Sequence, residues 1–83
     1  MKDPKEQEIL DRINALVEEE HELRGREETA MLLQAEAERL ASIEVQLDRF
    51  WDLLRQRRAR RDAGQDPDDV SMRPADIVEG YEQ

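Results

Sequence analysis

The single histidine, His21, follows Glu18 at the Glu-x-x-His spacing with which ferritin-like four-helix bundles hold paired iron ions. Two hairpins in a dimer would bring two such motifs into one core. Helical geometry opposes this, because about 100° of rotation per residue turns Glu18 away from the apolar stripe and leaves His21 at its rim. A metal site at Glu18 and His21 is therefore a distant alternative to a solvated acidic helix end.

A second candidate cluster is basic. Residues 49–61 hold six of the thirteen Lys and Arg residues, with the only Phe and the only Trp. Acidic residues outnumber basic ones by 14 to 6 in residues 1–48 and by 7 to 1 in residues 62–83. Arginines that grip phosphates beside a tryptophan that stacks on a base would suit a nucleic acid. The cluster consists of Arg55, Arg57, Arg58, Arg60 and Arg61.

Nucleic-acid binding nevertheless remains an alternative. At helical spacing these five arginines surround the helix instead of lining one side. The chain also has a formal net charge of −9, which repels a polyanion at long range. A protein surface is therefore the favoured partner of residues 49–61.

The sequence has few of the residues that other catalytic mechanisms need. The serines, Ser42 and Ser71, do not stand in a nucleophile turn, and no glycine-rich phosphate loop is present. The absence of cysteine removes thiol catalysis, thiolate metal sites and disulfides. The sequence therefore predicts a non-enzyme with no cofactor and no small-molecule substrate. No apolar run follows Met1, so we expect a cytoplasmic location and no contact with a membrane.

The composition predicts an all-α fold of long solvated helices, because 42% of residues are charged and there are three Gly and three Pro. The first helix is expected over about residues 4–24, with Asp3 as its N-cap and Gly25 as its C-cap. Its apolar stripe has spacings of three and four residues. The stripe consists of Ile9, Leu10, Ile13, Leu16, Val17 and Leu23.

The second helix is expected over about residues 27–63, before Gly64 and Pro67. Its apolar seam consists of Leu33, Leu40, Ile43, Leu47, Phe50, Trp51 and Leu54. If the first stripe continued through Gly25, polar Gln34 and Asp48 would fall on it. This break of register favours an antiparallel hairpin with unequal arms, and one continuous helix is the alternative.

Unequal arms would leave the end of the longer helix uncovered. We therefore expect a homodimer, an antiparallel four-helix or coiled-coil-like assembly in which the long helices cover each other. The predicted self-association residues are Leu47, Phe50, Trp51 and Leu54.

Glu20 lies within the apolar stripe, where a carboxylate needs a basic partner. In an antiparallel dimer, the acidic hairpin tip of one copy would lie beside the arginine cluster of the other. Arg58 is the best candidate partner among the five arginines, since it lies at the centre of the second stripe. Such exposed pairs would set register more than stability.

Residues 64–83 form an acidic tail whose Pro and Gly residues exclude a long helix. It is either a disordered tail or a segment that folds back with its carboxylates over the arginines. Its apolar side chains are more numerous than a solubilising tail requires. These predicted docking residues are Val70, Met72, Ile77, Val78 and Tyr81.

Three segments carry a resemblance to a known family. They are Leu16-Val17-Glu18-Glu19-Glu20-His21-Glu22-Leu23-Arg24, then Trp51-Asp52-Leu53-Leu54-Arg55-Gln56-Arg57-Arg58-Ala59-Arg60-Arg61, then Arg73-Pro74 with Val78-Glu79-Gly80-Tyr81. They resemble a family of short, mostly actinobacterial proteins described as a domain of unknown function. The resemblance implies a cytoplasmic bacterial protein of two helices and a tail, with no assigned activity. The expected function is that of a non-catalytic structural or protein-interaction module.

Overall fold

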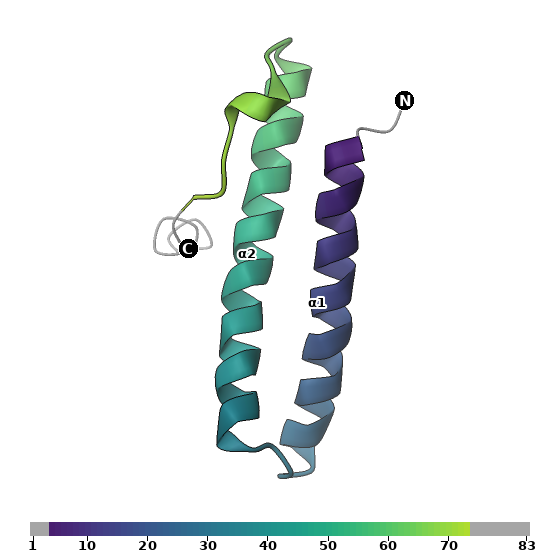
Figure 1. The fold of residues 1–83 in the computed structure, drawn as a ribbon, viewed down its shortest axis with the longest axis vertical. Helices are drawn as coiled ribbons and strands as arrows, with labels where there is room; N and C mark the ends of the chain where they lie inside the picture. Colours follow the sequence, from purple (N-terminus) through teal and green to yellow (C-terminus); the bar gives the residue numbers. More distant parts are fainter. Residues whose placement is uncertain (1–3, 74–83) are drawn as a thin grey trace.

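The protein is a hairpin of two long helices. The structure, a computed structural model, describes residues 4–73. Helices α1 (Pro4–Glu28) and α2 (Gln34–Asp62) lie antiparallel, and a 3-10 helix, η1 (Pro67–Asp69), follows. Figure 1 shows η1 across the end of α2, and the residues after it, up to residue 73, on the side of α2 that faces away from α1. The all-α hairpin prediction is confirmed, while Ile77, Val78 and Tyr81 lie outside the described residues.

One apolar seam joins the two helices. Each contributes side chains at spacings of three and four residues, as amphipathic helices do. The buried apolar residues are Ile9, Ile13, Leu16, Leu23, Leu40, Ile43, Leu47 and Leu54. Because these side chains interdigitate, the seam fixes which residues of α1 and α2 lie level with each other. Neither helix has an apolar stretch long enough to cross a membrane.

The first helix does not end at Gly25, so that prediction is wrong. Helix α1 continues to Glu28 and ends with Ala30 in the left-handed region, at φ 59°. The N–H of Met31 donates to the carbonyl of Arg26 at 2.9 Å, and the N–H of Ala30 donates to that of Glu27 at 3.0 Å. These two bonds form a Schellman motif, a helix ending that usually carries glycine where this chain has alanine.

Contacts on both sides of Gly25 explain why the helix passes through it. A glycine inside a helix costs about 1 kcal/mol relative to alanine, which other contacts readily offset. Here Arg24 pairs with Glu44 of α2, and Arg26 pairs with Glu36. The change of register after Leu23 therefore marks the end of the apolar seam and not the end of the helix.

The second helix starts later than expected, at Gln34. Leu33 precedes it as an exposed N-cap residue instead of a seam residue, and its N–H donates to the Glu36 carboxylate at 3.2 Å. At the other end Gly64 has a φ of 74°, and its N–H donates to the carbonyl of Arg61 at 3.1 Å. The left-handed conformation that ends α2 thus falls on a glycine.

The expected overhang of the second helix is absent. Helices α1 and α2 have 25 and 29 residues, so their free ends lie close together. Glu6 near the start of α1 contacts Arg58, and Lys5 contacts Asp68 at 3.0 Å. The expectation of an uncovered Leu54 is wrong, because this side chain is 1% exposed within the hairpin's own seam.

Substitutions at the two glycines test where α1 ends. We expect Gly25→Ala to raise the free energy of unfolding by about 0.5–1 kcal/mol, because the site is helical and exposed. A Cβ at Gly25 meets nothing within 4 Å. Gly64→Ala is the matched control and should lower the free energy of unfolding by about 1 kcal/mol, since Gly64 has a positive φ. Chemical denaturation measures both values, and a less stable Gly25→Ala variant would place the turn at Gly25 after all.

Candidate functional site

Most arginines of the cluster contact groups in the same chain. The Glu6 carboxylate accepts hydrogen bonds from Arg58 and Arg61, each at 2.8 Å. These bonds, with that of Arg58 foremost, hold the pKa of Glu6 below its ordinary range. Arg60 donates to the side-chain oxygen of Gln65 at 3.4 Å. The arginines therefore surround the helix because they have different neighbours on different sides.

A buried ion pair joins the tail to α2. Asp52 is 1% exposed and pairs with Arg73, whose Nε donates to the carboxylate at 2.9 Å. Gln56, one turn later, donates to the same carboxylate at 2.8 Å, and Arg49 donates to the carbonyl oxygen of Arg73 at 2.9 Å. Burial disfavours a charged carboxylate, but the Arg73 hydrogen bonds are stronger and hold the pKa of Asp52 below its ordinary range.

A second contact fixes η1. Arg57, which is buried, donates to Asp68 at 2.9 Å and to the carbonyl oxygen of Pro67 at 3.2 Å. Lys5 contacts the same carboxylate from α1, so Asp68 links the tail to both helices. Hydrogen bonds from Arg57 and then Lys5 lower the pKa of Asp68. We call the contacts of Arg49, Asp52 and Arg57 with Asp68 and Arg73 the tail clamp.

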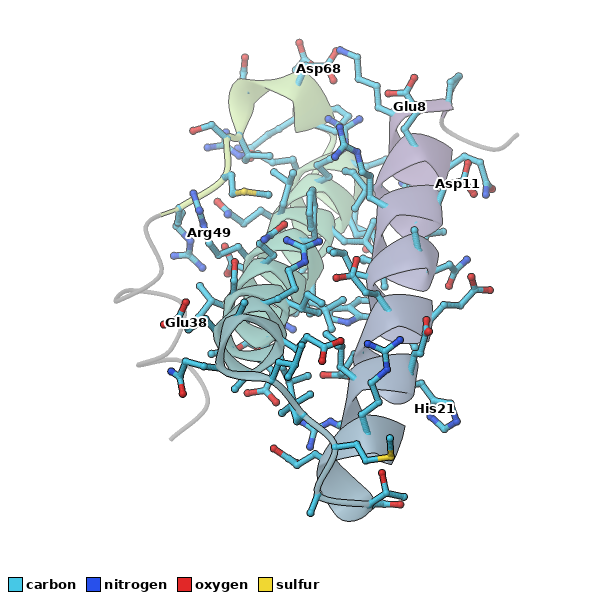
Figure 2. All side chains as sticks on the ribbon, turned by 60° about the horizontal axis from the view of Figure 1, so that its bottom comes forward. Glu8, Asp11, His21, Glu38, Arg49 and Asp68 are labelled. Carbon is cyan, nitrogen blue, oxygen red and sulfur yellow. The ribbon has the colours of Figure 1, made fainter. Side chains whose placement is uncertain are left out.

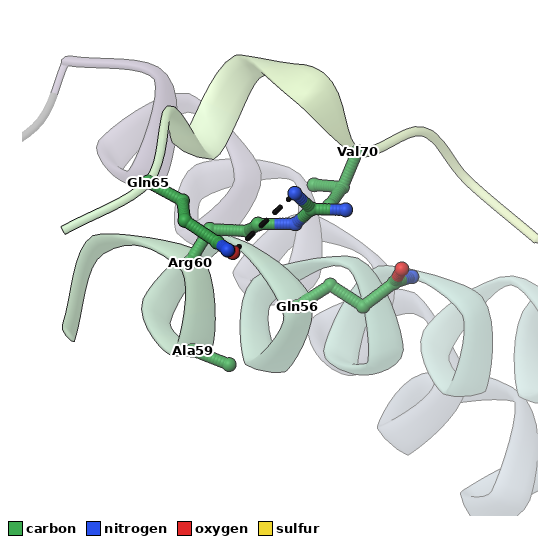
Figure 3. Close-up of a pocket in the computed structure, with 5 residues that line it drawn as sticks. All are labelled: Gln56, Ala59, Arg60, Gln65 and Val70. Carbon is green, nitrogen blue, oxygen red and sulfur yellow. Dashed lines mark hydrogen bonds between the residues drawn. The ribbon is translucent and has the colours of Figure 1, made fainter. Parts of the chain in front are cut away.

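The apolar residues of the tail that the structure describes lie beside this clamp. Val70 and Met72 are half-buried. Val70 lines a small surface pocket with Gln56, Ala59, Arg60 and Gln65, and Figure 3 shows Arg60 reaching across it to Gln65. The pocket lies where the tail meets α2, and two of its polar groups, those of Arg60 and Gln65, bond to each other.

The structure does not bring other metal-binding residues to Glu18 and His21. Both side chains are exposed, and Figure 2 shows His21 projecting from α1 on the side away from α2. Within residues 4–73, no group of three or more His, Cys, Asp and Glu side chains is placed to hold a metal ion.

Glu20 and Arg58 lie at opposite ends of the hairpin and do not meet within one chain. Glu20 is half-buried at the edge of the seam, where Arg24 lies 3.7 Å from its carboxylate. Arg58 pairs with Glu6 at 2.7 Å. The basic partner that Glu20 needs at its position in the stripe is thus Arg24, one turn later on the same helix.

The predicted self-association residues are not equally accessible. Leu47 and Leu54 are buried in the seam, and Phe50 is half-buried against it. Trp51 is 41% exposed. Leu47 and Leu54 therefore stabilise the hairpin itself, and Trp51 is the member of this set that a second molecule can reach.

Sequence reasoning missed Asp52 and Arg73 as a pair. One signal was present, since Arg73 is the single basic residue of the tail after Arg61. A lone arginine in an acidic segment already has acidic neighbours, so its partner on α2 could not be inferred from charge alone. Asp52 was equally hidden, because it lies on the face of α2 away from the apolar seam.

These features define the class of the protein, a small α-helical hairpin whose tail is fixed across one helix. A family described as "Protein of unknown function (DUF2630)" matches residues 5–83, and the chain belongs to this family. Uncharacterized proteins of Mycobacterium bovis and of two Mycobacterium tuberculosis strains are each 47% identical over 79 residues. The match covers 94% of this chain and 91% of each relative. No solved structure matches the chain.

Removal of the buried carboxylate should release the tail. We expect Asp52→Ala to weaken tail docking by about 2 kcal/mol, a roughly 30-fold increase in the undocked population, because Arg73 loses a charged hydrogen-bond partner. Hydrogen exchange over residues 66–73 measures this. Arg39→Ala is the control, since it removes an exposed pair with Glu19 that does not touch the tail. Unchanged exchange in Asp52→Ala would show that the clamp does not fix the tail.

Acid should also release the tail. The pKa values of Asp52 and Asp68 lie below the ordinary value of 3.8 when the tail is docked. Their contribution to docking is therefore complete above pH 3.8 and is lost as the pH falls below it, through the lowered values. An NMR titration of the Asp52 carboxyl carbon, followed with the amide signals of residues 68–73, measures the transition. A tail that undocks between pH 5 and 7 would contradict this assignment.

Proposed function

We propose that this protein is a non-catalytic interaction module that self-associates through α2. The observation that carries the proposal is the exposed Trp51 near the middle of an otherwise well-packed hairpin. A tryptophan is the side chain most enriched at the energetic centres of protein interfaces. At 41% exposure, much of this side chain is open to a partner.

The position of the exposed apolar side chains supports an interface over scattered surface residues. Among residues 4–73 the exposed large ones are Val17, Met31, Leu33 and Trp51. Met31 and Leu33 lie in the turn. Val17 and Trp51 lie on the helices, where rigid backbone can present them to a partner without a large loss of conformational entropy.

The arginine contacts weaken the nucleic-acid alternative. Arg57, Arg58 and Arg61 already pair with carboxylates of the same chain. A phosphate would have to displace these partners while approaching a chain of net charge −9. A protein surface that contacts Trp51 needs no such exchange.

Light scattering of the wild type and two variants tests the proposal. The measured mass of the wild type should rise from 9.8 kDa toward twice that value as the protein concentration increases. Trp51→Gln should weaken association more than about 30-fold, as loss of a central tryptophan costs 2 kcal/mol or more. Met31→Gln removes a more exposed apolar side chain in the turn and should change nothing.

A wild type that stays at 9.8 kDa at every concentration would overturn self-association. If that monomer bound labelled oligonucleotides with an affinity that fell steeply with salt, the nucleic-acid alternative would replace the proposal.

A further inference from the structure

The surface around Trp51 is defined by two ion pairs. Arg24 of α1 pairs with Glu44 of α2 toward the turn, and Glu6 of α1 pairs with Arg58 of α2 toward the free ends. Glu44 and Arg58 are 14 residues apart on α2, and Glu6 and Arg24 are 18 apart on α1. Both spacings are close to whole numbers of helical turns, so the two pairs mark the same side of the hairpin. Their four residues, with Leu10, Val17 and Trp51, are called the Trp51 flank below.

Helical periodicity places the apolar residues between these pairs. Trp51 is seven residues from both Glu44 and Arg58, and Val17 is seven residues from both Arg24 and Leu10. Residues seven apart lie nearly above one another on a helix. The Trp51 flank thus has an apolar centre bounded at each end by charge.

The described part of the tail, residues 64–73, contacts other faces of α2. The tail clamp uses Asp52 and Arg49, which helical rotation turns away from Glu44 and Arg58. Figure 1 shows the residues between η1 and residue 73 on the side of α2 opposite α1. The other side of the hairpin, where Arg39 pairs with Glu19, has no exposed large apolar side chain among the described residues. Among residues 4–73, the Trp51 flank is therefore the side of the helices on which large apolar side chains, Val17 and Trp51, are left exposed.

The charges on this flank are self-complementary. On α2, Glu44 and Arg58 lie about 10 Å on either side of Trp51, at 1.5 Å per residue. A twofold axis through Trp51 and perpendicular to the helix exchanges these two positions between copies. On α1 the order is reversed, because Glu6 lies toward the free end and Arg24 toward the turn. Both helices therefore carry opposite charges at opposite ends.

We propose that the Trp51 flank binds a second copy of this chain in antiparallel orientation, with Trp51 at the twofold axis. Glu44 of each copy then faces Arg58 of the other, and Glu6 faces the region of Arg24. This inference rests on the proposed self-association and specifies its surface and direction. A parallel dimer with α2 against α2 would instead place Glu44 against Glu44 and Arg58 against Arg58, which repel, and a parallel dimer with α2 against α1 would move Trp51 off the axis.

The dimensions of the hairpin suit such an interface. Its longest dimension is 49 Å. The Trp51 flank takes up about 21 Å of this length on α2 and about 27 Å on α1, at 1.5 Å per residue, which is the extent of a small interface. A small apolar centre with charged ends gives an association whose direction is set by charge and whose strength is set by Trp51.

Cysteine cross-linking tests the direction directly, because the chain contains no cysteine. Glu44→Cys and Arg58→Cys variants are oxidised separately and as a mixture, at a concentration where light scattering shows a dimer. We expect a disulfide between the two different variants in clear excess over random pairing, and almost none within either variant alone. Met31→Cys, in the exposed turn, is the control for collisional cross-linking.

The emission of the single tryptophan gives a second measurement. Burial of Trp51 at the axis should shift its emission to shorter wavelength as the dimer forms, with the same concentration dependence as the mass. Both readouts use the whole chain and need no identified ligand.

Each of the other outcomes contradicts one part of the proposal: the direction, the surface or self-association itself. A dimer that gives disulfides within one variant is parallel, which contradicts the antiparallel direction and leaves self-association intact. A dimer that shows the emission shift but neither disulfide uses the flank in parallel, with α2 against α1 of its partner, which also contradicts the antiparallel direction. A dimer without the emission shift associates through another surface. A wild type that is monomeric throughout removes both this inference and the proposed function.

Discussion

The apolar seam between α1 and α2 is the constraint on which the other contacts depend. Two helices can bury only one stripe each, so their relative position is set by how Ile13, Ile43 and Leu54 interdigitate. Displacement of α1 by one turn would move its charged residues by about 5 Å relative to α2. The pairs of Glu6 with Arg58 and of Arg24 with Glu44 then could not form together.

The seam could be predicted because it rests on repeated apolar spacing. Eight buried residues share the pattern, and an error at any one position leaves the stripe recognisable. The turn could not be predicted, because it depends on the backbone conformation of one residue. Ala30 adopts the left-handed region that glycine usually occupies, while Gly25 lies in ordinary helix. The left-handed residue was therefore expected five residues too early. This displaced the predicted helix ends and produced an overhang that the hairpin does not have.

The tail clamp shows a second limit. That the acidic tail lies beside the arginines could be anticipated from opposite charge, and Val70 and Met72 were named from their apolar character. The particular pairs follow from geometry that the sequence does not state. Asp52 is a polar residue on the outer face of α2, and it is buried only because Arg73 and the tail lie over it. A buried carboxylate of this kind specifies position, since a tail without an arginine there would leave it unpaired.

The distribution of arginines around α2 follows from the number of surfaces that this helix contacts. Arg58 and Arg61 face the start of α1 through Glu6, and Arg57 faces η1 through Asp68. The encircling pattern thus follows from contacts within the chain on two sides of α2, and it is unexpected of a groove-binding helix. The same reasoning explains why Trp51 is conspicuous. It lies between charges that already have partners, and it is the large side chain on α2 whose own contacts within the chain leave much of it exposed. An interface centred there would use the charges that hold the hairpin together to orient a second molecule.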